Sequence, residues 1–232
     1  MSDSVPALEF DSVSVTYDGD SRPSIRNITL RIGVAERVAL LGNNGSGKTT
    51  LLYAAAGLIP YEGTIRVGGV VLGTSTKEEI RARLGFLFSN PEDQILLPRV
   101  LDDVAFALSR RNTPAEEQSV KAAAMLRRLD SEALAERSPH QLSQGERLRV
   151  ALAGALIGKP PLLLLDEPSE NLDPPGKRGL ASLLVETGTA MLLATHDLRF
   201  AGRCCSRFVV LAGGEVVQDT PSPGDLLPSW DY

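Results

Sequence analysis

The chain has 232 residues, of which 43% are hydrophobic and 23% charged, a composition that suits one α/β domain with a substantial core. The formal net charge of −5 argues against a nucleic-acid-binding surface. No run reaches the roughly 18 apolar residues of a membrane span, and residues 1–4 lack the basic and apolar regions of a signal peptide. We therefore expect a soluble protein that reaches a membrane only through partners.

Antiparallel strands are predicted at the start of the chain. Residues 8–17 and 25–32 alternate apolar and polar side chains, which indicates two half-buried strands. The turn between them falls at Asp18-Gly19-Asp20. A continuous apolar run at residues 38–41 has instead the length of a buried parallel strand.

A phosphate-binding loop is predicted directly after this apolar run. Residues 42–49 match the pattern G-x-x-x-x-G-K-[ST], in which glycines turn the backbone so that its N–H groups point at an anion. A helix from Lys48 to about residue 56 directs its positive end to the same place. Lys48 supplies a charge for the outer phosphates, and the Thr49 hydroxyl can ligate Mg²⁺. We expect the nucleoside-triphosphate contacts to come from Asn43, Asn44, Gly45, Ser46, Gly47, Lys48, Thr49 and Thr50.

The middle of the chain changes from strand signals to helix signals. A hairpin around Gly68-Gly69 comes first, followed by a short charged helix at residues 77–84 and a short strand at residues 85–88. From residue 100 to about 136, alanine, leucine, arginine and glutamate dominate, which indicates a helical insertion. Within it Pro114 suits the first residue of a helix. Helix is expected again near Gln144.

Buried strands return in the last third of the chain. The apolar run at residues 161–166 ends in Asp166-Glu167. A carboxylate at the end of a parallel strand lies beside the phosphate loop, so Asp166 can hold Mg²⁺ and Glu167 can orient or deprotonate a water. The alternative, a strand that ends in two solvated acids, is disfavoured by the phosphate loop. The remaining predictions are a helix at 174–186, strands at 191–195, 207–211 and 215–217, and an irregular tail from 220.

The pentapeptide Leu142-Ser143-Gln144-Gly145-Glu146 is the third motif. Together with the phosphate loop and Asp166-Glu167, it makes nearly the whole chain resemble an ATP-binding-cassette ATPase, whose signature is usually written L-S-G-G-Q. The resemblance implies an α/β fold, namely a P-loop NTPase core with a parallel sheet, an N-terminal antiparallel β subdomain and a helical signature subdomain. It implies a single domain: a nucleotide-binding core at 1–90 and 160–218, the helical subdomain at about 91–159, and a tail at 219–232.

The resemblance also implies ATP and Mg²⁺ as ligands and a second ATPase subunit, most simply another copy packed head to tail. Ser143 and the N–H groups of Gln144 and Gly145 open a helix and so form a second anion site. In the family, that site serves the nucleotide of the opposite subunit. A capping box between Ser143 and Glu146 is the purely structural alternative, and both roles are compatible.

Further site residues follow from the resemblance alone. Tyr17 matches the aromatic residue that stacks on adenine, and residues 170–173 match a loop at the dimer interface. His196 matches the residue that contacts the γ-phosphate and fixes the attacking water, so Glu167 and His196 are the expected catalytic residues. Metal contacts are expected from Thr49, Asp166 and the position of Ser89. At that position the family normally has a glutamine, and serine is too short to replace it without a bridging water.

A subfamily is indicated by two segments, residues 88–95 and 102–106. They resemble the corresponding segments in the ATPase component of energy-coupling-factor transporters. This implies an integral-membrane coupling subunit docked near residues 89–106, a substrate-binding membrane subunit, and a peripheral location on the cytoplasmic face of the cell membrane. Biotin is the favoured cargo, and cobalt or nickel comes next. We expect an acidic docking groove formed by Glu92, Asp93, Asp102 and Asp103. The alternatives are an ABC-type ATPase not tied to transport, and a kinase or GTPase, which would need neither residues 142–146 nor His196.

Overall fold

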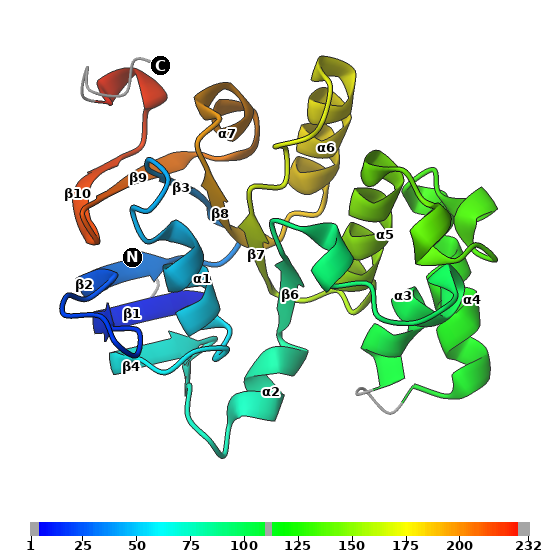
Figure 1. The fold of residues 1–232 in the computed structure, drawn as a ribbon, viewed down its shortest axis with the longest axis horizontal. Coiled ribbons are helices and arrows are strands. Elements are labelled where there is room, and N and C mark those ends of the chain that lie inside the picture. Colours follow the sequence, from blue (N-terminus) through cyan, green and yellow to red (C-terminus); the bar gives the residue numbers. More distant parts are fainter. Residues whose placement is uncertain (1–4, 110–112, 227–232) are drawn as a thin grey trace.

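An antiparallel sheet forms from the first third of the chain (Figure 1). The computed structural model describes residues 5–109 and 113–226. In it β1 (Leu8–Val15), β2 (Ile25–Ile32), β4 (Glu62–Val67) and β5 (Val70–Val71) lie in the order β2-β1-β4-β5. The strand predicted at 25–32 is confirmed at both ends. β1 ends at Val15 rather than at residue 17, so Tyr17 lies just beyond the strand.

The second sheet is parallel except at one edge. Its order is β10-β9-β3-β8-β7-β6, and its members are β3 (Arg37–Leu41), β6 (Leu84–Leu87), β7 (Leu162–Asp166), β8 (Ala190–Thr195), β9 (Arg207–Ala212) and β10 (Glu215–Thr220). Only β10 pairs antiparallel, with β9, among these described strands. The register sets Leu41 beside Thr195 and Asp166 beside Ala194. The carboxyl ends of β3, β7 and β8 therefore meet at one edge of the sheet.

Helices cover both faces of the parallel sheet. α1 (Lys48–Ala55) packs between this sheet and the antiparallel one, whereas α6 (Pro174–Glu186) and α7 (Leu198–Cys204) lie on the opposite face. α2 (Lys77–Ala82) leads into β6. The limits of α6 are those predicted, because Asp173 caps its start and prolines occupy its first turn.

A group of helices stands beside β6 at one end of the molecule (green in Figure 1). It contains α3 (Val100–Ser109), α4 (Ala115–Arg128) and α5 (Gln144–Ile157), which pack against one another. The predicted helical stretch from 100 to 136 thus contains two α-helices, and Pro114 is the N-cap of α4 rather than its first residue. Short 3₁₀ helices occur at Pro91–Asp93, Glu132–Leu134, Pro139–Gln141 and Pro223–Asp225.

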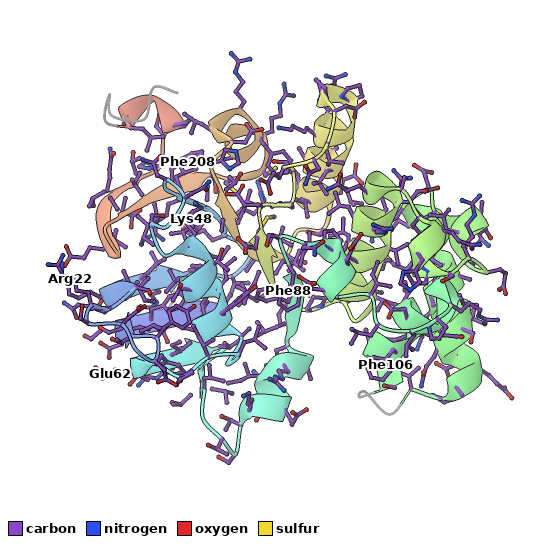
Figure 2. The ribbon with its side chains drawn as sticks, viewed as in Figure 1. Arg22, Lys48, Glu62, Phe88, Phe106 and Phe208 are labelled. Atoms are coloured by element: carbon purple, nitrogen blue, oxygen red, sulfur yellow. The ribbon has the colours of Figure 1, made fainter. Side chains whose placement is uncertain are left out.

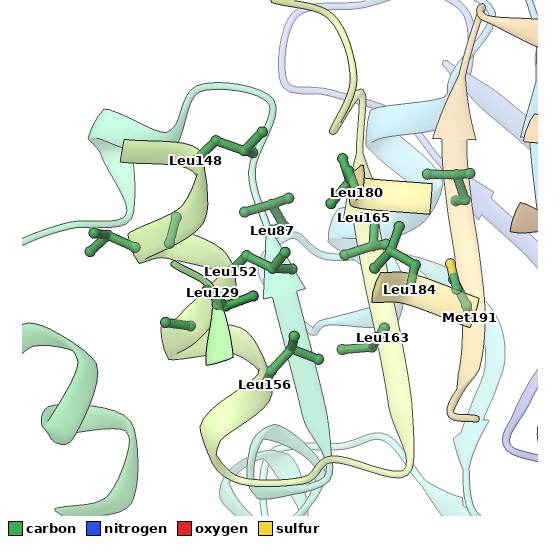
Figure 3. Close-up of a cluster of buried hydrophobic side chains, with 14 of the residues drawn as sticks. Leu87, Leu129, Leu148, Leu152, Leu156, Leu163, Leu165, Leu180, Leu184 and Met191 are labelled. Carbon is green, nitrogen blue, oxygen red and sulfur yellow. The ribbon is translucent and has the colours of Figure 1, made fainter. Parts of the chain in front are cut away.

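β7 is buried on both faces because its side chains alternate between two hydrophobic clusters. Leu163 and Leu165 pack toward α5 and α6, where Leu152 and Leu184 face them (Figure 3). Leu162 and Leu164 pack toward α1 and the antiparallel sheet. Every residue of β7 is buried, including Asp166 at its end. The strand is therefore held from both sides, which fixes the position of the acidic residues that follow it.

One helix was missed, and other predictions need correction or fall outside the described residues. α7 was not predicted, and β10 runs to Thr220, beyond the predicted end at residue 217. The tail predicted as irregular contains a 3₁₀ helix at Pro223–Asp225, and its residues 227–232 lie outside the described residues. Residues 1–4, which were expected not to form a signal peptide, also lie outside the described residues. In the described ranges, no helix has the length and hydropathy needed to cross a membrane.

Candidate functional site

The predicted phosphate loop forms the connection from β3 to α1 and borders a cavity of about 390 Å³. Gly47 is the N-cap of α1 and has φ 103°, in the left-handed region that favours glycine. A Cβ atom at Gly47 would overlap the Ile25 side chain and come within 2.8 Å of the Ser24 carbonyl oxygen. The cavity is lined by Ser24, Asn44, Gly45, Ser46, Gly47, Lys48, Thr49, Thr50 and Glu167. The loop thus exposes backbone around a site of suitable size for phosphate groups.

Lys48 lies inside this loop, at the start of α1 (Figure 2). Its side chain is 6% exposed, and Nζ donates to the carbonyl oxygens of Gly42 at 2.6 Å and Asn43 at 3.3 Å. The same nitrogen is 3.8 Å from Glu167 Oε1. The loop carbonyls therefore fix a buried positive charge at the phosphate cavity, near Glu167.

Thr49 and Asp166 lie side by side, as predicted for a metal site. Thr49 Oγ1 donates to Asp166 Oδ2 at 2.9 Å, and Asp166 Oδ1 is buried with no hydrogen-bond partner in the described structure. Burial raises the pKa of Asp166, although the Thr49 hydrogen bond acts in the opposite direction. A hydroxyl and a buried carboxylate with an unused oxygen are the hard oxygen ligands that Mg²⁺ prefers, so these residues fit the ion.

Glu167 and His196 are brought together at the ends of β7 and β8. Glu167 Oε2 lies 3.1 Å from His196 Nδ1 and accepts from the His196 backbone N–H at 3.3 Å. Glu167 has φ 46°, a backbone conformation that costs a non-glycine residue roughly 1–2 kcal/mol. Oε1 has no hydrogen-bond partner among the described residues. A strained, nearly buried carboxylate beside the phosphate cavity, with one oxygen that makes no hydrogen bond and lies 3.8 Å from Lys48 Nζ, is suited to hold a water.

The signature segment (residues 142–146) leads into the start of α5 and does not line the phosphate cavity. Ser143 forms the predicted capping box, because its backbone N–H and its hydroxyl donate to Glu146 Oε2 at 2.8 and 2.7 Å, and its Oγ accepts from the Glu146 N–H at 3.4 Å. Neither Ser143 nor Gly145 lines the phosphate cavity. Within one chain, the structure therefore does not bring the signature segment to the phosphate loop.

Tyr17 and Ser89 lie at the margins of the site. The Tyr17 hydroxyl is 3.2 Å from Thr50 Oγ1, and its side chain is 40% exposed. Ser89 is exposed and lines a narrow cavity of about 20 Å³ together with Gln144 and Glu167. Its predicted contact with the metal stays a prediction, whereas its position next to Glu167 follows from the structure.

Gln94 does not take the place of the absent glutamine. Its Oε1 accepts from the Phe88 N–H at 3.3 Å, and its Nε2 donates to the Ala151 carbonyl at 2.9 Å. This side chain ties the loop after β6 to α5. No local pattern indicated that role, because Phe88 and Ala151 are distant from each other along the chain.

The expected acidic docking groove stays a prediction, although three of its four acids have partners within the chain. Glu92 forms an ion pair with Arg147, and Asp102 forms one with Arg99 at 3.1 Å. Asp103 Oδ1 accepts from the backbone N–H groups of Leu96 and Leu97 at 2.8 and 2.9 Å. Burial raises the pKa of Asp103, which is a property of a loop-stabilising residue more than of an exposed docking charge.

Comparison with known proteins agrees with this geometry. The family model described as "ABC transporter" matches residues 25–170. A Gloeobacter violaceus protein named as an ABC transporter ATP-binding protein is 45% identical over 206 residues, covering 88% of this chain and 84% of that protein. The energy-coupling factor transporter ATP-binding protein EcfA of Methanothermobacter thermautotrophicus is 34% identical over 218 residues, covering 91% of this chain and 70% of that protein.

Two solved structures share the fold. CbiO1 of Clostridium perfringens, part of the ABC transporter complex CbiONQ, has a TM-score of 0.83 at 29% identity and covers 95% of this chain and 90% of that chain. The cassette MJ0796, as a dimer in a post-hydrolysis state with ADP and Pi, has a TM-score of 0.82 at 28% identity and covers 92% of this chain and 98% of that chain. The chain belongs to the ATP-binding proteins of the ABC transporter family and is an ATPase with the P-loop NTPase fold.

Proposed function

We propose that this chain is the ATP-hydrolysing subunit of a membrane importer and that ATP closes a head-to-tail dimer of two such subunits. The observation that carries the proposal is Glu167, held against His196 at 3.1 Å beside Lys48 and the phosphate cavity. The signature segment of one copy would complete the site of the other, because in a single chain it does not line the cavity. The helix start at Ser143 offers backbone N–H groups for that anion.

Each residue of the site would have its own role in ATP binding or hydrolysis. The loop N–H groups and Lys48 would hold the phosphates, while Tyr17 would stack on adenine beyond Thr50. Thr49 and Asp166 would hold Mg²⁺, which neutralises charge on the phosphates when it is bound. Glu167 would orient the water and accept its proton, and His196 would fix Glu167 and contact the γ-phosphate.

A groove beside Phe88 is the proposed docking site for the membrane subunits. It has a volume of about 440 Å³ and is lined from α2, β6, α3 and α5. Phe88 and Phe106 lie on it (Figure 2), and Leu96 and Phe106 are 74% and 47% exposed. Exposed apolar side chains around a groove mark an interaction site. An integral-membrane coupling subunit would dock here, next to a substrate-binding membrane subunit, at the cytoplasmic face of the membrane.

Two observations, the names of relatives and the sequence of one segment, support a proposal for the cargo of the importer. The relatives named EcfA and CbiO1 favour an energy-coupling-factor importer. The amino-acid sequence of residues 89–94 most resembles that of biotin-transporter ATPases, so biotin is the favoured cargo and cobalt or nickel comes next. Identification of the small molecule that co-purifies with the membrane subunits would decide among these cargoes.

Changing Leu96 and Phe106 together to Asp is expected to release the membrane subunits. Each lost apolar contact is worth about 1.5–3 kcal/mol, so the affinity should fall by at least about 10²-fold. Affinity purification from detergent-solubilised membranes would measure it, with Val120→Asp on α4 as the control because Val120 is apolar and also exposed, at 70%. ATP hydrolysis by the isolated double variant should stay within about twofold. Undiminished co-purification by the double variant would reject the docking groove, whereas a native protein that recovers no membrane subunit would favour an ATPase not tied to transport.

Replacing Ser89 with Gln is expected to raise the basal hydrolysis of the isolated protein by about three- to tenfold. The longer amide can reach the water and metal directly, and misplacement of a reacting group by about 1 Å can cost on the order of 10²-fold. Ser89 already lines the narrow cavity with Glu167, so the added amide points to the correct region. Steady-state hydrolysis and ATP affinity are compared in both forms. A lower rate in Ser89→Gln would show that the serine is itself the productive ligand.

A further inference from the structure

An ion pair links α6 to the residue next to His196. Lys177 Nζ lies 2.6 Å from Asp197 Oδ2, and the two side chains are only 31% and 21% exposed. Lys177 belongs to the first turn of α6, whereas Asp197 follows His196 at the start of α7. The two residues are 20 positions apart in the sequence. The contact therefore joins two separate elements beside the proposed catalytic pair.

Asp197 uses its two carboxylate oxygens for different contacts. Oδ1 accepts from the Phe200 N–H at 2.9 Å and so caps α7, which leaves Oδ2 for Lys177. Burial alone would raise the pKa of Asp197, but the hydrogen bonds from Lys177 and Phe200 outweigh it and lower that pKa. The backbone N–H of Asp197 also donates to Thr195 Oγ1 at 3.1 Å. The peptide on the C-terminal side of His196 is thus restrained at three points.

Lys177 is anchored independently of the loop that carries His196. Its backbone N–H donates to the Asp173 carbonyl at 2.9 Å, and Asp173 caps α6 through the Gly176 N–H. Leu180 and Leu184 hold α6 in the hydrophobic core (Figure 3). A rigid helix can therefore fix the position of Asp197, which lies directly after His196 in the chain.

We propose that Lys177 is a positioning residue for ATP hydrolysis, which holds His196 against Glu167 through Asp197. The inference rests on the proposed roles of Glu167 and His196. Glu167 Oε2 contacts both the His196 ring and its backbone N–H, so a shift of this loop changes both contacts at once. Lys177 itself does not line the phosphate cavity, so ATP binding should not depend on it.

Lys177→Met is expected to lower kcat about 5- to 20-fold while the KM for ATP stays within about twofold. A small displacement of the Glu167–His196 pair is sufficient for such a loss, because about 1 Å can cost on the order of 10²-fold. Lys177→Arg should recover most of the activity, since arginine can also donate to Asp197. Arg178→Met is the matched control, because Arg178 is the next residue, is exposed and carries the same charge. If Lys177 only stabilised the fold, Lys177→Met would lower the thermal stability of the protein, or Lys177→Arg would not restore its activity.

A double-mutant cycle separates this pair from the helix cap. Asp197→Asn keeps an N-cap side chain but removes the charge, so it should reduce kcat as Lys177→Met does. The double variant should be no slower than either single variant, since both remove the same interaction. An unchanged kcat in Lys177→Met, or fully additive losses in the double variant, would overturn the proposal.

Glu167→Gln, measured in the same series, separates this inference from the function on which it rests. If Glu167→Gln hydrolyses ATP at the native rate, the proposed catalytic role is wrong, and with it the basis for positioning. If Glu167→Gln is inactive while Lys177→Met has native kcat, only the role of Lys177 is rejected. Thermal unfolding of each variant shows whether a lost activity reflects a lost fold.

Discussion

Glu167→Gln should lower steady-state ATP hydrolysis by about 10²–10⁴-fold. The amide has the length of the carboxylate, so it can still accept from the His196 N–H, whose distance to Glu167 Oε2 is 3.3 Å. It cannot accept a proton from water at neutral pH. The positive φ of 46° at this position is unaffected, because the two side chains strain the backbone equally. The fold and ATP binding should therefore persist while the chemical step fails.

Glu186→Gln is the control for this substitution. Glu186 is exposed and is the last residue of α6. Its side-chain charge should matter little, so hydrolysis should stay within about threefold of the native rate. Hydrolysis by Glu167→Gln at such a rate would remove Glu167 from the catalytic step.

Lys48→Met should weaken ATP binding by about 10²–10⁴-fold. A charge-assisted hydrogen bond is worth about 1.5–3 kcal/mol, and an ammonium that bridges two phosphates makes two of them. Methionine has a similar length but no charge, so the loop keeps its packing and loses its cation. Lys48 also lies near Glu167 and lowers the pKa of Asp166, which is otherwise raised by burial. Its loss should therefore raise the pKa of Asp166 further and disfavour the charged form of that carboxylate.

Calorimetric titration with ATP and Mg²⁺ measures this loss. Lys121→Met is the control, because Lys121 is 51% exposed on α4 and pairs only with a neighbouring helical residue, Glu117, among the contacts described. Lys48→Arg should restore only part of the affinity, since the loop carbonyls surround a compact ammonium rather than a planar guanidinium. Native affinity in Lys48→Met would contradict the assignment of the phosphate site.

Local sequence patterns predicted the elements that local physics determines. β2 was predicted at both ends because its apolar residues alternate, and α6 because Asp173 and Pro174 mark its start. The phosphate loop was predicted because its glycines, lysine and threonine stand at fixed offsets within one short segment. The strand before Glu167 was predicted because a continuous apolar run indicates burial on both faces.

Contacts between distant residues could not be predicted in the same way. Glu92 and Arg147 are 55 residues apart, and no local pattern indicates that Glu92 is paired rather than free to dock a partner. Lys177 and Asp197 meet only because α6 packs beside α7. α7 itself spans residues 198–204, which is too short for a clear helical period, and Asp197 is its main local signal.

The role of the signature segment depends on a second copy of the chain. The capping box at Ser143 is visible in one chain and was predicted from Ser143 and Glu146 alone. Its contact with nucleotide is an intermolecular property, since Ser143 does not line the phosphate cavity of its own chain. Only the resemblance to a family indicated that role.

The molar mass of Glu167→Gln in the presence of ATP and Mg²⁺ tests the central claim most directly. One chain has a mass of 24.8 kDa, and static light scattering distinguishes it readily from twice that value. We predict a stable dimer with ATP and Mg²⁺, a monomer without nucleotide, and a monomer again when Ser143→Glu is added, because a carboxylate there would repel the phosphates. A Glu167→Gln protein that binds ATP yet stays monomeric at micromolar concentration would contradict ATP-driven closure.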